Sequence, residues 1–224
     1  MKIRHTLAAA TAVAAAVGLT IVPAVANADH GGSTATYRVT IENIATGFQP
    51  LSPSGVVVHS RWADVWNTGS PATAAVAAVA EDANLPVFVE TYAQTPGVSQ
   101  AFVGGAAPFG PGGSTTFEFE AGRGQRLSLV NMLVNTNDAF TGLDSVKLRN
   151  GTRVYEVGAY DAGTEANNEL GSHIPGPVGN NPFVRDPEGA VITHHAGVQG
   201  GGDLDQAEHG WDGPVARITI ERIG

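Results

Sequence analysis

The sequence predicts an all-β protein, an antiparallel two-sheet β-sandwich with one short Ala-rich helix. About seven short runs alternate apolar and polar residues, which is the period-2 pattern of half-buried strands. Turn signals rich in Gly and Pro separate these runs, and only one segment has the composition of a helix. This combination is typical of antiparallel sandwiches rather than of folds with a parallel sheet.

The first strand is expected at 35–44, where Tyr37, Val39 and Ile41 alternate with polar residues. The helix is expected at 70–84, beginning at Ser70 and Pro71. Long Gly-rich and Pro-rich stretches at the C-terminal end are expected to be loops. The other strands are expected at 56–60, 114–121, 126–134, 144–148, 152–158 and 215–223.

Residues 1–28 have the organisation of a secretory signal peptide. A positively charged start, "MKIRH", precedes an Ala-rich apolar run that ends in Ala26-Asn27-Ala28, the small-x-small pattern of a cleavage site. A membrane anchor is the alternative, although Gly18 and Pro23 interrupt the run. We therefore expect a secreted, extracellular protein that is cleaved after Ala28 and forms one domain over 29–224.

The composition limits the partners of this domain. The chain has no cysteine, so disulfides and thiolate chemistry are excluded. Its formal net charge is −9 at pH 7, and removal of the basic N-terminal segment makes the balance more acidic. Such a charge argues against nucleic acid and direct binding to anionic membranes, and it permits cation binding.

A cluster of carboxylates lies in "AYDAGTEANNELG", residues 159–171, which contains Asp161, Glu165 and Glu169. Asn150-Gly151, between two strand-like runs, is a strong signal for a two-residue hairpin turn. That hairpin would place residue 140 opposite 161 and Asp138 near Gly163, within a one-residue shift that a bulge could introduce.

Carboxylates that converge without basic neighbours repel one another, so one is protonated or a cation lies between them. Calcium suits an irregular, loop-built oxygen site better than magnesium does. Gly163 would take positive φ to bend the loop around the ion. An EF-hand is excluded because Ala166 and Ser172 occupy the positions that need Gly and Glu. A solvated acidic loop is the alternative, and further oxygens for an ion could come from backbone carbonyls or from Asn137, Asn167 and Asn168.

Other residue groups suggest weaker hypotheses. His194, His195 and His209 could suggest zinc, but adjacent strand residues point to opposite faces and the spacing is unusual. His59-Ser60 could suggest nucleophilic catalysis, but no G-x-S-x-G motif is present. Glu118 and Glu120 could suggest the paired carboxylates of a glycosidase, but their spacing equally fits the solvent-exposed face of a strand. For Asp203, Asp205, Glu208 and Asp212 we favour a solvated acidic loop over a second calcium site. For Trp62, Trp66 and Trp211 we favour packing in the core or at its rim over stacking on sugar rings.

Several segments together resemble the spondin N-terminal domain of the F-spondin and mindin family. They are "HSRWADVWNTGSPATAAVAAVAED", "RLSLVNMLVNTNDAFTGLDSVKL", "YDAGTEANNE", "DPEGAVI" and "VARITIERI", which span roughly 35–223. The resemblance implies a β-sandwich with calcium ligands at Asp138, Asp161 and Glu165. The chain departs from the family at Glu165, where an aspartate is usual, and it lacks the family's cysteines and thrombospondin-type repeats.

The sequence and the resemblance together predict a secreted, bacterial, calcium-binding spondin-domain protein. We expect a non-enzymatic module for cell adhesion or recognition, with an extracellular surface, a protein or a glycan as its ligand. The alternative from another class is a secreted hydrolase or carbohydrate-binding protein that uses the exposed loops.

Overall fold

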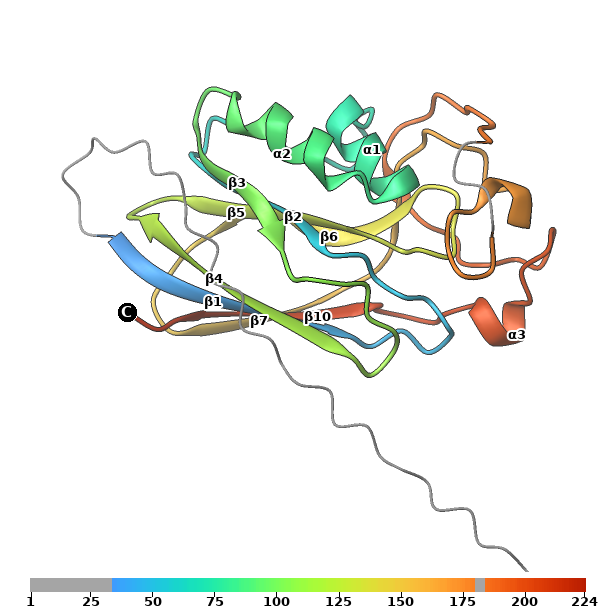
Figure 1. Ribbon diagram of the computed structural model, residues 1–224. Helices are drawn as coiled ribbons and strands as arrows, with labels where there is room; N and C mark the ends of the chain where they lie inside the picture. Colours follow the sequence, from blue (N-terminus) through green and yellow to red (C-terminus); the bar gives the residue numbers. More distant parts are fainter. Residues whose placement is uncertain (1–33, 180–183) are drawn as a thin grey trace, which may run out of the picture.

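A computed structural model describes residues 34–179 and 184–224 (Figure 1), and the expected signal peptide lies outside these residues. The chain forms two antiparallel sheets that lie face to face, which confirms the predicted β-sandwich. The four-stranded sheet has the order β4 (Ser114–Gly122), β1 (Thr34–Asn43), β10 (Ala216–Arg222) and β7 (Thr152–Val157). The six-stranded sheet has the order β3 (Val98–Gly104), β2 (Ser54–His59), β5 (Arg126–Met132), β6 (Ala139–Lys147), β8 (Tyr160–Asp161) and β9 (Thr193–His194).

The main hydrophobic core lies between the two sheets. Every second residue of β1 is buried, so Tyr37, Val39 and Ile41 point inward as their alternation predicted. They pack in one cluster with Phe117 of β4 and Leu129 of β5. Alternation is therefore a reliable guide to the four-stranded sheet, whose outer face contacts water.

The six-stranded sheet is covered on its outer face by two helices (Figure 1), α1 (Ala74–Asp82) and α2 (Leu85–Ala93). Every residue of β2 is consequently buried. Phe88 of α2 packs with Val57, Phe140 and Trp66 in a second core. The expected packing of Trp66 is thus confirmed, since this tryptophan is a core residue, whereas the packing expected of Trp62 is wrong because its side chain is exposed.

The sequence indicated one helix where the structure has two longer helices and a short third one, α3 (Gln206–His209). Helix α1 begins later than expected, because Thr73 rather than Ser70 is its N-cap and accepts a hydrogen bond from the Val76 N–H. Helix α2 was missed, although its buried Leu85, Phe88 and Tyr92 have helical spacing. Strands β3, β8 and β9 were also not expected.

The predicted hairpin around Asn150-Gly151 is wrong. Strand β6 stays in the six-stranded sheet, whereas β7 crosses over and pairs with β10 of the other sheet. Gly151 does take positive φ, 76°, but in a connection between sheets. The crossover is favourable because it pairs the free side of β10 and buries Leu148 in the core between the sheets.

The consequence drawn from that hairpin nevertheless holds. After β7 the chain returns to the six-stranded sheet as β8, which pairs with the start of β6. Ala139 lies opposite Asp161 and Phe140 opposite Tyr160, one residue from the predicted register. The topology therefore brings Asp138 beside the loop that begins at Asp161.

Within the described residues, no helix combines the length and the apolar character that crossing a membrane requires.

Candidate metal centre

Asp138 is the centre of the predicted site and is completely buried directly before the start of β6. Its Oδ2 accepts three hydrogen bonds from the 163–165 loop: from the Thr164 N–H at 2.8 Å, the Thr164 hydroxyl at 3.1 Å and the Glu165 N–H at 3.0 Å. Its Oδ1 is also buried but has no hydrogen-bond partner among the described residues. A buried oxygen without a partner is unusual and marks a place where a ligand could bind.

Asp161 is the second carboxylate of the site. Its Oδ1 accepts a hydrogen bond from the Gly163 N–H at 2.7 Å, and its Oδ2 accepts one from the Asn167 amide. Gly163 has φ of 69°, as predicted, and a Cβ there would lie 2.8 Å from the carbonyl carbon of Ala190. The loop thus bends tightly between β8 and the 190–191 segment, and only glycine fits at the bend.

The two carboxylates influence each other electrostatically. Burial, and after it the charge of Asp161, raise the pKa of Asp138 to about 6. The hydrogen bonds from Glu165 and Thr164 oppose this change because they stabilise the ionised form. A cation bound beside Asp138 would favour the ionised carboxylate in the same way and more strongly.

Glu165 contributes its backbone to this site, but its carboxylate lies elsewhere. The N–H group contacts Asp138, whereas Oε2 accepts a hydrogen bond from the Asp186 N–H at 2.7 Å. Oε1 lies 3.6 Å from Nε of Arg185, which also forms ion pairs with Glu81 and Asp82. The structure therefore brings together two of the three predicted carboxylates.

The three asparagines named as further ligands form a hydrogen-bonded network around the loop. Asn137 donates to the Asn168 side-chain oxygen at 3.1 Å, and Asn167 connects Asp161 with His195. Their side chains already have partners in the loop. The network holds the 161–169 segment in place.

Glu169, whose role the sequence reasoning missed, is a buried carboxylate in this network. Its Oε1 accepts a hydrogen bond from the Gln199 N–H and its Oε2 one from the Gly201 N–H. Its own backbone has φ of 57°, which is rare outside glycine. Glu169 thus ties the 199–201 loop to the acidic segment, a tertiary role that the local sequence does not indicate.

No group of three or more His, Cys, Asp or Glu side chains is arranged to hold a metal ion within 34–179 and 184–224. The fit to an ion therefore depends on Asp138 and Asp161 together with oxygens of other kinds. The pair would suit a hard cation, because both groups are carboxylates and one of their oxygens is buried without a partner among the described residues.

The second acidic loop has structural roles that separate its members. Asp203 accepts a hydrogen bond from the Gly171 N–H, and Asp205 caps α3 through the Ala207 N–H. The main-chain N–H of Asp212 donates to the Thr46 hydroxyl. The loop was expected to be solvated, but Asp203 and Asp205 make defined hydrogen bonds to the backbone.

The adjacent histidines of the zinc hypothesis point to opposite sides, as their strand geometry predicted. His194 stacks on Tyr160, with ring centroids 5.0 Å apart, and His195 packs against Trp211 at 5.2 Å. His209 lies on α3, where its Nδ1 contacts the Asp205 carbonyl oxygen. These separate environments account for the three imidazoles.

The candidate catalytic residues also have structural environments. His59 is fully buried; its Nδ1–H donates to the Ser60 carbonyl at 2.8 Å, and its Nε2 lies 2.9 Å from the hydroxyl of the equally buried Ser128. Burial lowers the pKa of His59, which favours the neutral ring. Glu118 is in an ion pair with Arg38 on the outer face of β4, and Glu120 is exposed there.

No protein-family model matches this chain, and no curated protein matches it.

Proposed function

We propose that this protein is a secreted, calcium-binding recognition or adhesion module of the spondin type without catalytic activity. The observation that carries the ion site is the buried Oδ1 of Asp138, which lacks a partner while Asp161 lies beside it. A buried carboxylate oxygen without a partner is unfavourable when the group is ionised, and a divalent cation would stabilise it. The resemblance to the spondin family, which places calcium ligands at Asp138 and Asp161, supports this proposal, and so does the two-sheet fold.

In this proposal Asp138 and Asp161 are the protein ligands of calcium. The loop 163–165 holds Asp138 through the oxygen that does not face the ion, so the carboxylate is oriented before the ion binds. Glu165 supports the site through its backbone N–H, while its carboxylate binds the 185–186 segment. The ion would add charge neutralisation and a link between the start of β6 and the loop after β8.

The non-enzymatic reading is supported by the surroundings of the candidate catalytic groups. The His59–Ser128 pair is fully buried, so a substrate could not reach its hydroxyl in this conformation. Recognition would instead use the loops near the ion. They lie at the end of the sandwich where the 197–213 segment, which contains α3, is found (Figure 1).

The ion site is tested by thermal unfolding of the 29–224 protein in excess EDTA, in millimolar calcium and in millimolar magnesium. Binding to the native state alone stabilises by RT ln(1 + [L]/Kd), about 2.7 kcal/mol at a hundredfold excess over Kd. For a domain of this size we expect calcium to raise Tm by about 5–10 °C, and magnesium to raise it less.

The variants of this experiment are matched in charge. Asp161→Asn should lose most of the calcium effect, whereas Glu120→Gln, which removes one negative charge from an exposed strand position, should retain it. Identical melting curves with EDTA and calcium for the unmodified protein would leave the acidic segment as a hydrogen-bonded loop and refute the ion site.

A further inference from the structure

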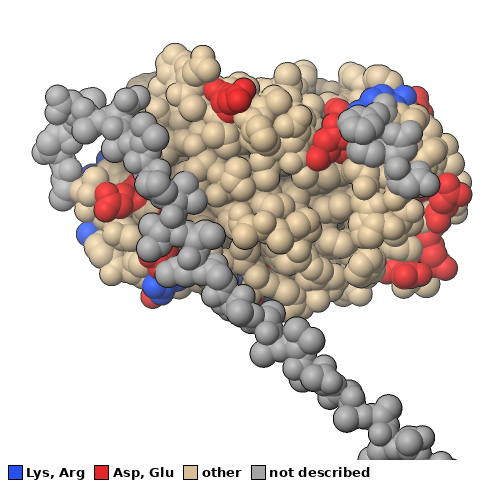
Figure 2. Space-filling view, viewed as in Figure 1, with Lys and Arg blue, Asp and Glu red and all other residues tan. Residues whose placement is uncertain are grey.

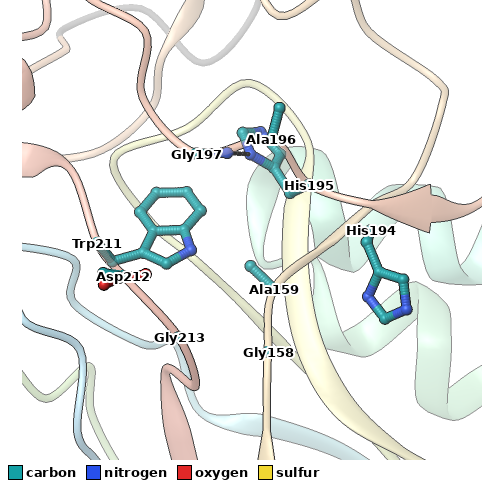
Figure 3. A pocket seen from close by; sticks show the side chains of 9 residues that line it. All are labelled: Gly158, Ala159, His194, His195, Ala196, Gly197, Trp211, Asp212 and Gly213. Atoms are coloured by element: carbon teal, nitrogen blue, oxygen red, sulfur yellow. Dashed lines mark hydrogen bonds between the residues drawn. The ribbon is translucent and has the colours of Figure 1, made fainter.

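An open pocket of about 270 Å³ (Figure 3) has His195 among its lining residues. This histidine is hydrogen-bonded to Asn167, which donates to Asp161 of the candidate metal centre. It is formed where the chain before β8, the segment after β9 and the loop after α3 come together. The lining residues are Gly158, Ala159, His194, His195, Ala196, Gly197, Trp211, Asp212 and Gly213. Several of them are small, so the main groups available to a ligand are backbone atoms, aromatic rings and one carboxylate.

The aromatic residues of the pocket, His195 and Trp211, are held in place by hydrogen bonds and packing. His195 donates from Nε2 to the Asn167 side-chain oxygen at 3.0 Å and accepts at Nδ1 from the Gly197 N–H at 2.9 Å, so both ring nitrogens are occupied. Trp211 packs against His195 and against the cluster of Ile174, Val198 and Leu204. A fixed indole ring of this kind offers a preorganised surface for a flat or cationic group.

Asp212 is the charged group of the pocket. Its N–H donates to the Thr46 hydroxyl, but within the described residues its carboxylate has neither an ion pair nor a hydrogen bond. The carboxylate therefore remains available beside the indole, and Figure 3 shows the two side chains on neighbouring positions of the same loop.

The surroundings of the pocket are acidic. No Lys or Arg is among its lining residues. The negative charges of Asp161 and Glu169, which do not line the pocket, are close enough to act on His195. Asp203, Asp205 and Glu208 belong to the same loop region as Asp212. Figure 2 shows Asp and Glu side chains gathered at the end of the molecule where α3 lies. Such a field attracts cations and repels anions.

We propose that this pocket binds the guanidinium group of an arginine side chain on a protein partner. The inference rests on the recognition role proposed above and gives the partner's chemistry. A guanidinium stacks on the indole of Trp211 and donates to the carboxylate of Asp212, two interactions that one planar cation makes at once. A sugar ring could stack on the same indole, but the acidic surroundings would add nothing to its binding.

The test is an NMR titration of the ¹⁵N-labelled 29–224 protein, in which the indole N–H resonances of the three tryptophans report separately. The probes are N-acetyl-argininamide, its neutral isostere N-acetyl-citrullinamide, and methyl β-glucoside. We expect millimolar binding of the arginine probe that shifts the Trp211 indole resonance and leaves that of the exposed Trp62 in place. The citrulline probe should bind about tenfold more weakly or not at all.

The decisive variant is Asp212→Asn, because the Asp212 carboxylate has no partner in the described part of the chain and the fold should tolerate the change. It should weaken the arginine probe about tenfold and abolish the preference over citrulline. Glu120→Gln, which removes the same charge at a distant exposed site, should bind like the unmodified protein. Raising the salt from low to high concentration should weaken binding of the arginine probe.

Equal affinities for the arginine and citrulline probes, or unchanged binding by Asp212→Asn, would overturn the proposal. Binding of the glucoside alone would overturn it in favour of a glycan ligand. Each titration is repeated in EDTA and in calcium, and arginine binding is expected in both because Asp212 is not an ion ligand in our scheme. Failure of the ion site would appear in the melting curves, whereas failure of this pocket would appear only in the titration.

Discussion

At the scale of single residues, the candidate site depends on a difference in hydrogen bonding between the two carboxylate oxygens of Asp138. One oxygen accepts three hydrogen bonds, which fix the carboxylate, and the other is buried with no partner among the described residues. The first oxygen has the contacts of a structural carboxylate, and the second is the oxygen that our proposal assigns to the ion. This asymmetry is what distinguishes Asp138 from the acidic residues that cap helices or turns elsewhere in the chain.

The position of the Glu165 carboxylate leads to a prediction that separates an ion ligand from a structural residue. Glu165→Gln removes the charge that faces Arg185 and weakens the bond to the Asp186 N–H, so we expect a loss of about 1–3 kcal/mol in stability. The increase in Tm on adding calcium should be retained, because that carboxylate does not face Asp138. Thermal unfolding with EDTA and with calcium measures both quantities.

A loss of the calcium effect in Glu165→Gln, equal to the loss expected for Asp161→Asn, would contradict this assignment. It would mean that Glu165 leaves Arg185 and turns to the ion when calcium binds.

Asp144, on β6, provides a pH-dependent prediction away from the ion site. Burial, and next the charge of Asp64, raise its pKa to about 6 from an ordinary value of 3.8, and its Oδ1 is buried without a partner in the described part of the chain. Because the folded pKa is the higher one, Asp144 favours folding at low pH, and this contribution is lost as the pH rises through about 6.

Asp144→Asn removes that titration. The stability of this variant minus that of the unmodified protein should therefore be larger at pH 7.5 than at pH 4.5. The change should occur between the two pKa values, 3.8 and about 6. The measurement is the difference in Tm between the two proteins at several pH values in EDTA. The difference cancels the opposite effect of His59, whose lowered pKa makes the native state less stable in acid. A difference that does not change with pH would contradict the interpretation of Asp144.

At the scale of elements, the pairing of β6 with its neighbours positions the site. Strand β6 pairs with β5 along most of its length and with β8 only at its first two residues, directly after Asp138. The acidic loop is therefore attached to β6 at one short contact. Beyond it, the loop is held by hydrogen bonds to the Asp138 side chain and by backbone hydrogen bonds to the 186–190 segment. An ion at this point would reinforce the short pairing of β6 with β8.

The pairing of β5 with β6 requires a glycine at position 142. A Cβ on Gly142 would lie 1.9 Å from the backbone oxygen of Leu129, which cannot move without distorting β5. Gly142→Ala should therefore destabilise the domain severely, by more than about 3 kcal/mol, and reduce the yield of folded protein. The control is Gly110→Ala, where a Cβ would meet nothing within 4 Å.

Circular dichroism and thermal unfolding of both glycine variants test this prediction. Equal stabilities of the two would show that β5 and β6 are not packed as closely as the structure has them.

At the scale of the whole molecule, the two sheets differ in how they meet water. Helices α1 and α2 cover the six-stranded sheet, whereas the outer face of the four-stranded sheet has ion pairs such as Arg38–Glu118 and Arg217–Glu42. These exposed pairs contribute little to stability. Their presence instead keeps a broad sheet face polar, which leaves the loop end near α3 as the surface with distinctive chemistry.

Export belongs to the same scale. We expect the exported protein to begin at Asp29, within a residue or two, because Ala26-Asn27-Ala28 has the pattern of a signal-peptidase site. Intact mass and N-terminal sequencing of protein recovered from the medium of an expressing bacterium measure this directly. Extracellular protein that retains Met1 would contradict the signal peptide.

The alternation of apolar residues was enough to predict the sandwich and most of its strands. It succeeded for β1 and β4 because one face of their sheet contacts water and the other the core, which produces the period of two. It was less informative for the central strands of the six-stranded sheet, such as β2, because helices cover that sheet and these strands are buried on both faces. Helix α2 was missed although its buried residues have helical spacing. Positive φ at Gly163 was likewise predictable, since a tight bend between close segments favours glycine.

The tertiary structure alone decided which strands are neighbours and which carboxylates face one another. Asn150-Gly151 indicates a reversal of the chain, but the local sequence does not record that β10 offers β7 a better partner than β6 does. Likewise, Glu165 lies in the acidic motif, but its carboxylate turns to Arg185. Arg185 also pairs with Glu81 and Asp82, which are distant in the sequence. Local sequence determines turns and alternation because these depend on neighbouring residues. Strand partners and carboxylate contacts depend on the free energy of pairing across the whole molecule, which only the folded structure specifies.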